Sequence, residues 1–173
     1  MRDKLRRRYQ VQRELTRRGY YEGAIALSEM RRLGELLNPD EVAPAERRIK
    51  VNFEFLRNEY EVPTIAGRLQ TSLELQCQRC LQALEMPLEL EFRLMIDASD
   101  ELLRDGSLDT LYSDDGVIDL YEVIEDELIL AIPLVARHDN AACNEYWPDS
   151  EANPESAAKE NPFAVLRQLK TTN

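Results

Sequence analysis

Hydrophobic residues between positions 48 and 97 recur at every second position, which is the period of a strand with one buried face. The alternation is clearest over residues 49–55, 65–76 and 88–96. In the first of these stretches, Val51 and Phe53 stand on either side of the polar Asn52. Because one face of each stretch is apolar and the other is polar, we predict an antiparallel sheet that buries one face.

Residues 119–132 follow the period of a helix instead. Asp119 is a good N-cap, Glu122 three residues later completes a pattern like a capping box, and Pro133 ends the apolar run. We therefore predict one core helix that packs on the sheet. The preceding segment, residues 97–119, has a strong excess of Asp and predicts an acidic loop with one strand near 109–113.

Shorter helical patterns lie towards both ends of the chain, over residues 1–18, 24–37 and 161–170. The fold class is therefore α+β: an antiparallel sheet that can curl toward a barrel, one packed core helix, N-terminal helices and a short C-terminal helix. We divide the chain into a basic N-terminal helical region (1–46), an α+β core domain (47–143) and a polar linker with the C-terminal helix (144–173).

Charge is divided unevenly along the 173 residues, whose net charge is −11. Residues 1–50 hold 13 Lys/Arg and 8 Asp/Glu, a net +5, whereas residues 51–173 hold 9 and 25, a net −16. A basic arm can approach phosphates, and an acidic body suits a basic protein. The acidic excess can also serve solubility alone. The candidate RNA-binding residues are Arg6, Arg7, Arg8, Arg13, Arg17 and Arg18.

The chain has no apolar run near the ~20 residues that cross a bilayer, and its first thirty residues lack the apolar region of a signal peptide. We therefore expect a cytoplasmic protein without a membrane partner.

The sharpest local motif is Cys77-Gln78-Arg79-Cys80, at the predicted end of a strand. Two thiolates separated by two residues on a turn can hold one metal ion. His138 and Cys143, which complete the inventory of Cys and His in the chain, would make the set Cys3His and bind Zn2+. Free thiols are the alternative, and a redox pair is less favoured because a strand rather than a helix is expected next.

Several segments, taken in order, resemble the bacterial YceD-like family. They are the Cys77–Cys80 motif, the acidic and apolar helix from Asp119 to Val135, the pair His138 and Cys143, and the Asn161-Pro162-Phe163 segment that runs on to Lys170. The resemblance covers residues 19–170, and the Arg-rich first eighteen residues lie outside it. It implies a role in the synthesis, processing or stability of large-subunit ribosomal RNA, and it implies no catalytic residues.

Three hypotheses follow. The first is a non-enzymatic factor that binds pre-ribosomal RNA, a basic protein of the large ribosomal subunit, or both, with no small-molecule substrate. The second is an enzyme, either a small zinc hydrolase or a nuclease, although four protein ligands would close a zinc site to substrate. The third is a zinc-binding protein-interaction module without direct RNA contact. Candidate partner-binding residues are Glu125, Asp126 and Glu127 on the core helix and Phe163, Val165 and Leu166 on the last one.

Overall fold

The computed structural model describes residues 5–37, 46–97, 109–113, 115–140 and 143. The helices and strands given below belong to a compact unit of residues 1–137. A second unit, residues 138–173, is described only at 138–140 and 143, so the predicted linker and C-terminal helix lie outside the described residues. None of the described helices has both the length and the apolar character that crossing a membrane requires.

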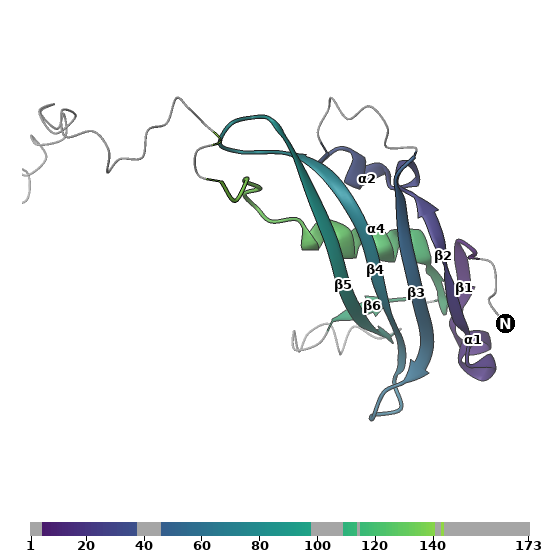
Figure 1. Ribbon diagram of the computed structural model, residues 1–173. Coiled ribbons are helices and arrows are strands. Elements are labelled where there is room, and N and C mark those ends of the chain that lie inside the picture. Colours follow the sequence, from purple (N-terminus) through teal and green to yellow (C-terminus); the bar gives the residue numbers. More distant parts are fainter. Residues whose placement is uncertain (1–4, 38–45, 98–108, 114, 141–142, 144–173) are drawn as a thin grey trace, which may run out of the picture. The chain divides into compact units, whose positions relative to one another are not determined.

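A five-stranded sheet forms most of the fold, in the strand order β2-β3-β4-β5-β6 (Figure 1). Its strands are β2 (Tyr20–Ala26), β3 (Arg48–Arg57), β4 (Pro63–Gln76), β5 (Ala83–Asp97) and β6 (Thr110–Tyr112). The first four pair antiparallel, and β6 runs parallel to the end of β5. The predicted α+β class is confirmed. No pairing among the described strands joins β6 to β2, so the sheet is open rather than a closed barrel.

The alternation in the sequence matches the two faces of this sheet. Along β3, Val51 and Phe53 are buried, whereas Lys50 and Glu54 on the other face are exposed. The buried aromatic rings pack at short distances: the ring centroids of Tyr21 and Phe53 are 5.1 Å apart. Burial of one apolar face along several strands supplies the main driving force for this fold.

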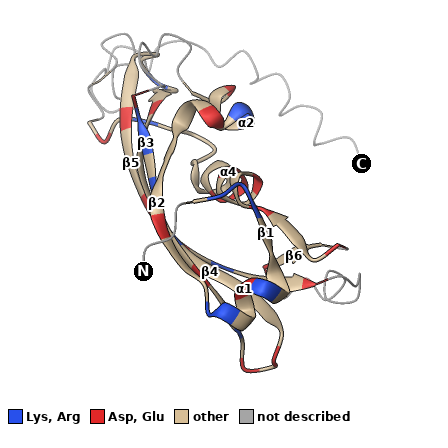
Figure 2. Ribbon diagram, turned by 90° about the vertical axis from the view of Figure 1, so that its right-hand side faces the viewer, with Lys and Arg blue, Asp and Glu red and all other residues tan. Residues whose placement is uncertain are grey.

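The core helix is α4 (Leu120–Ala131), and it follows β7 (Val117–Asp119) directly. Asp119 caps it as predicted, because its Oδ1 accepts hydrogen bonds from the backbone N–H groups of Tyr121 (3.0 Å) and Glu122 (3.4 Å). Figure 2 shows α4 and β1 (Arg8–Gln10) on one side of the curved sheet. The helix therefore covers the apolar face of the sheet, as expected.

The N-terminal region differs from the prediction in part. Within residues 5–18, the described part of the helix predicted over 1–18, only α1 (Val11–Arg17) is helical. It is preceded by β1, which pairs antiparallel with β7. β7 itself lies in the acidic segment, where only β6 was expected. The helix ends as predicted before Gly19, because Arg18 adopts a left-handed conformation with φ 49°.

The predicted helix over residues 24–37 is wrong. Its first part belongs to β2, and the rest forms a 3-10 turn, η1 (Leu27–Glu29), and the single-turn helix α2 (Arg31–Gly34). Ile25 and Leu27 are both buried, and they belong to an apolar pattern that fits the buried face of a helix as well as that of a strand. The apolar pattern therefore could not decide between a helix and a strand. β2 pairs along its whole length with residues 48–54 of β3, which satisfies the backbone groups on that side of β2. This long-range pairing outweighs the local preference.

Candidate functional site

The turn between β4 and β5, residues 77–82, carries the first two candidate metal ligands. The backbone N–H of Cys77 donates to the carbonyl of Gln82 (2.9 Å), and the N–H of Leu81 donates to the carbonyl of Cys77 (2.9 Å). Leu81 has φ 61°, a left-handed conformation that reverses the chain after Cys80. Two backbone hydrogen bonds and one tight reversal thus hold both cysteines at the end of the longest hairpin.

A second segment reaches this turn after α4. Pro133 lacks the N–H that a continuing helix needs, and the helix ends at Ile132, whose backbone is extended. Gln78 in the turn donates its backbone N–H to the carbonyl of the buried Ala136 (2.8 Å). Further along, the backbone N–H of Cys143 donates to the carbonyl of Asn140 (3.2 Å). His138 therefore lies two residues after Ala136, the residue whose carbonyl is bonded to the turn that carries Cys77 and Cys80.

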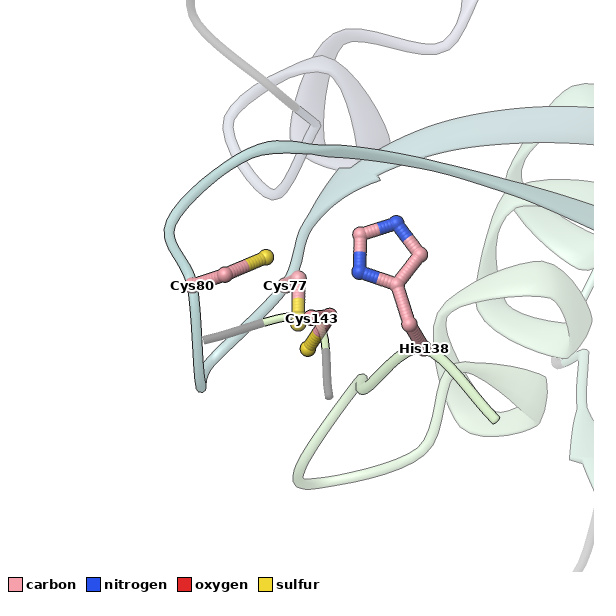
Figure 3. Close-up of side chains that lie close together, drawn as sticks. All are labelled: Cys77, Cys80, His138 and Cys143. Carbon is pink, nitrogen blue, oxygen red and sulfur yellow. The ribbon is translucent and has the colours of Figure 1, made fainter. Parts of the chain in front are cut away.

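Figure 3 shows the side chains of Cys77, Cys80, His138 and Cys143 close together. Their candidate ligand atoms all lie within 4.8 Å of one another. In a tetrahedral zinc site with a Zn–S distance of about 2.3 Å, neighbouring ligand atoms are about 3.8 Å apart, so a shift of roughly 1 Å would complete the geometry. Cys77 is buried and the other three are partly buried. The structure thus brings together the four residues that the sequence grouped, and they fit Zn2+.

Of the six candidate RNA-binding arginines, Arg6 and Arg7 are engaged within the fold. The Nη2 of Arg6 contacts Oε1 of the buried Glu14 (3.3 Å) and donates to the hydroxyl of Tyr21 (3.2 Å). Burial, aided by the hydrogen bond to Glu14, raises the pKa of Tyr21 to about 12, so its hydroxyl stays protonated and donates to that carboxylate. Arg7 contacts Oδ2 of the N-cap Asp119 (2.9 Å).

The other four arginines, Arg8, Arg13, Arg17 and Arg18, are exposed. Figure 2 shows basic positions on β1 and α1. Within the described residues, Arg8, Arg13 and Arg18 have no carboxylate partner. The arrangement therefore offers an exposed basic surface, which we define as these four residues.

The three acidic candidates on α4 differ in their surroundings. Glu125 is buried, and its Oε1 accepts from the backbone N–H groups of Arg32 (2.6 Å) and Leu33 (3.0 Å). Burial by itself would raise the pKa of Glu125, but the hydrogen bonds from Leu33 and Arg32 outweigh it and the pKa is lowered. Asp126 is exposed and pairs with Nη1 of Arg32 (2.7 Å). Glu127 is partly buried near Asp109.

Sequence reasoning missed that Glu125 joins α4 to α2. Its partner Arg32 lies 93 positions away, so local patterns carry no sign of the contact. One signal in the sequence could have found it. Glu125 lies beside the apolar stripe of the helix, and a carboxylate buried there needs hydrogen-bond or ion-pair partners. The other candidates, Phe163, Val165 and Leu166, lie outside the described residues.

The fold and this site define a class: an α+β protein built on an open antiparallel sheet, whose longest hairpin carries two of four clustered Cys and His residues. Residues 65–170 match the family described as "Large ribosomal RNA subunit accumulation protein YceD". A protein of that name from Haemophilus influenzae is 34% identical over 168 residues, covering 92% of this chain and 90% of the relative. The chain therefore belongs to the YceD family. No solved structure matches it.

Proposed function

We propose that this protein is a non-enzymatic cytoplasmic factor that supports the synthesis, processing or stability of large-subunit ribosomal RNA. The observation that carries the proposal is the 34% identity over 92% of the chain to a relative named for accumulation of that RNA. We assign no catalytic residue. The ion pairs of Glu125 and Asp126 on α4 and the proposed RNA contacts of the arginines on α1 require no catalytic step.

Deletion and complementation test this role. A strain that lacks the gene should contain less large-subunit ribosomal RNA relative to small-subunit RNA, and the wild-type chain should restore the ratio. Northern blots of precursor and mature species separate synthesis from processing, because a processing defect accumulates precursors. An unchanged ratio in the deletion strain would refute the proposal.

We infer that the exposed basic surface contacts RNA. Arg8, Arg13 and Arg18 support this contact because each is exposed, and no carboxylate within the described residues neutralises them. Phosphate contacts release counterions, so affinity should fall steeply with salt. Each lost contact to single-stranded RNA lowers the salt slope by about 0.7.

The sharpest test is the triple variant Arg8→Ala, Arg13→Ala and Arg18→Ala, which avoids Arg6 and Arg7 because these stabilise the fold. Binding of a large-subunit RNA fragment should weaken, and the salt slope should fall by about 2. The matched control, Arg31→Ala, Arg48→Ala and Lys50→Ala, removes the same charge from exposed positions on α2 and β3. Equal loss in both variants would show that only net charge matters.

We further propose that Cys77, Cys80, His138 and Cys143 hold a structural Zn2+. The support is the chemistry of the ligand set, three thiolates and one imidazole with ligand atoms within 4.8 Å of one another. Zn2+ held this way would have four protein ligands and no open position for substrate. Its contribution would be stability of the cysteine turn rather than catalysis.

The acidic body supports a second contact, with a basic protein of the large subunit. Residues 51–173 carry a net charge of −16, which repels RNA and attracts basic chains. The alternative function is a small zinc-binding interaction module without direct RNA contact. A tagged pull-down with and without ribonuclease distinguishes the two. RNA-independent recovery of protein partners, with no RNA bound by the purified protein, would favour the alternative.

A further inference from the structure

Among the strands that the structure describes, one edge of the large sheet is open over most of its length. β5 pairs with β4 from Ala83 to Met95, but on its other side it pairs with β6 only from Met95 to Asp97. None of the described strands pairs with that other side of β5 over residues 84–94. A long open edge is a template for another strand, and proteins usually cover or disrupt such edges.

The register shows which backbone groups face outward. The N–H of Met95 donates to the carbonyl of Asp109 (2.9 Å) ahead of β6, so the backbone groups of Met95 point away from β4. Since the N–H and C=O of a residue in an antiparallel pair share one side and alternate along the strand, those of Glu89, Glu91 and Arg93 also point outward. Pro87 falls on the same register, where its missing N–H breaks no bond to β4.

The side chains on the inner face of this edge are apolar and incompletely covered. Leu84, Met86, Leu88 and Leu90 are all partly exposed. Beside Leu94, a groove of about 370 Å3 lies between the end of β5, β6 and α4. Leu130 of α4 lines this groove and is 78% exposed. A strand added to β5 would bury these apolar groups on its inner side.

The groove also selects the charge of its occupant. Three carboxylates line it, those of Asp109, Asp126 and Glu127, and the only cation there, Arg32, already pairs with Asp126. Burial, then repulsion from Asp109 and Asp126, raises the pKa of Glu127, so an added cation would relieve an existing cost.

A second copy of this chain fits the edge less well. An antiparallel pairing of two β5 edges centred on Leu88 would set Glu85 of each copy against Glu91 of the other. Like charges on facing strands are destabilising.

We propose that the open edge of β5, together with this groove, binds an extended segment of a partner protein in which basic and apolar residues alternate. The segment would add as a strand, with its N–H and C=O groups on Glu89, Glu91 and Arg93 and its apolar side chains over the inner face. Its basic side chains would lie beside the carboxylates of the outer face, and one further basic residue, past the end of the alternation, would lie in the groove. This inference rests on the proposed contact with a basic protein and names the surface and the chemistry of the segment.

The probe is a labelled peptide of alternating lysine and valine, as long as the open edge and followed by one extra lysine for the groove. It is titrated into the full-length protein and followed by fluorescence anisotropy. There are two control peptides. One has the same residues in scrambled order, and the other has the same sequence with alternate amides N-methylated, so that these amides cannot donate to a strand. We expect the alternating peptide to bind at least about tenfold more tightly than either control. Hydrogen exchange should show new protection at the amides of Glu89, Glu91 and Arg93.

Matched variants locate the contact. Glu91→Pro removes one outward N–H, whereas Glu91→Thr loses the same carboxylate and keeps the N–H. The proline variant should bind about threefold to tenfold more weakly than the threonine variant, as expected for one lost hydrogen bond. Leu130→Arg puts a positive charge at an exposed helix position in the groove, so it should weaken binding of a basic peptide without affecting Tm. This variant tests the inference even if the proline variant unfolds.

Equal binding of the N-methylated peptide, or equal affinity of both Glu91 variants, would overturn the inference. Protection of the same amides by large-subunit RNA, or by dimerisation of the protein alone, would assign the edge to another occupant and overturn it too. These outcomes are separable from failure of the proposed function. A chain that restores the ribosomal RNA ratio but does not bind the peptide refutes only the strand addition.

Discussion

Removal of the Glu125 carboxylate should destabilise the protein far more than removal of its neighbour Asp126. Both carboxylates contact the same Arg32 side chain, but Glu125 is buried and Asp126 is 52% exposed. Glu125 also accepts the backbone N–H groups of Arg32 and Leu33 at the start of α2. Glu125 and Asp126 thus allow a buried and an exposed carboxylate to be compared on the same arginine, Arg32.

The magnitude follows from the groups left without a partner. Glu125→Ala leaves two N–H groups unsatisfied, and each costs about 1–3 kcal/mol when buried. Allowing for some access of water, we expect a loss of about 2–5 kcal/mol. Asp126→Ala removes one exposed ion pair and should cost at most about 1 kcal/mol. Glu125→Gln keeps an acceptor for the N–H groups and should fall between them.

The assay is urea unfolding followed by circular dichroism, repeated from pH 7 to pH 3. Because the folded pKa of Glu125 lies below its unfolded value, the stability it contributes is present above the unfolded pKa and is lost as pH falls through the folded pKa. The difference between wild type and Glu125→Gln should therefore shrink on acidification. A loss in Glu125→Ala no larger than in Asp126→Ala, or a difference that does not change with pH, would refute the reasoning.

Three further predictions concern the core, the N-terminus and the metal site. Gly67→Ala should cost about 1–3 kcal/mol, because its Cβ would lie 2.3 Å from the carbonyl oxygen of Asn52, whereas Gly34→Ala meets open space and should be neutral or stabilising in the same urea assay. Arg6→Ala should destabilise by about 1–3 kcal/mol, since it leaves the buried Glu14 without its cation, while Arg13→Ala should leave the unfolding midpoint unchanged. Purified protein should contain one zinc per chain by elemental analysis, and a chelator should lower its Tm by about 5–11 °C. This shift corresponds to the stabilisation of about 2.7 kcal/mol that a metal ion at ~100 times its Kd gives to the folded state. Cys80→Ser should contain less zinc and lose less Tm on chelation; equal Tm values with and without the chelator would contradict a structural metal.

The metal site shows how far sequence reasoning could reach. Grouping Cys77, Cys80, His138 and Cys143 needed only the spacing of the first pair and the fact that the chain has no other Cys or His. Their approach to within 4.8 Å depends on the long hairpin and on the turn after α4, which no local pattern encodes. The basic residues show the opposite case. Their charge was evident in the sequence, but the pairing of Arg6 with Glu14 and of Arg7 with the distant Asp119 was not.

The sequence alone determined the sheet from residue 48 onward and the helix α4, because both bury an apolar face whose period, 2 or 3.6, is written in adjacent positions. It also determined the N-cap at Asp119, which acts within three residues. Only the tertiary structure decided that residues 20–26 form a strand, that Glu125 joins two helices and that no described strand pairs with the outer side of β5 over residues 84–94. These features depend on partners distant along the chain, and the free energy of long-range pairing and burial exceeds the small local preferences that a sequence pattern records.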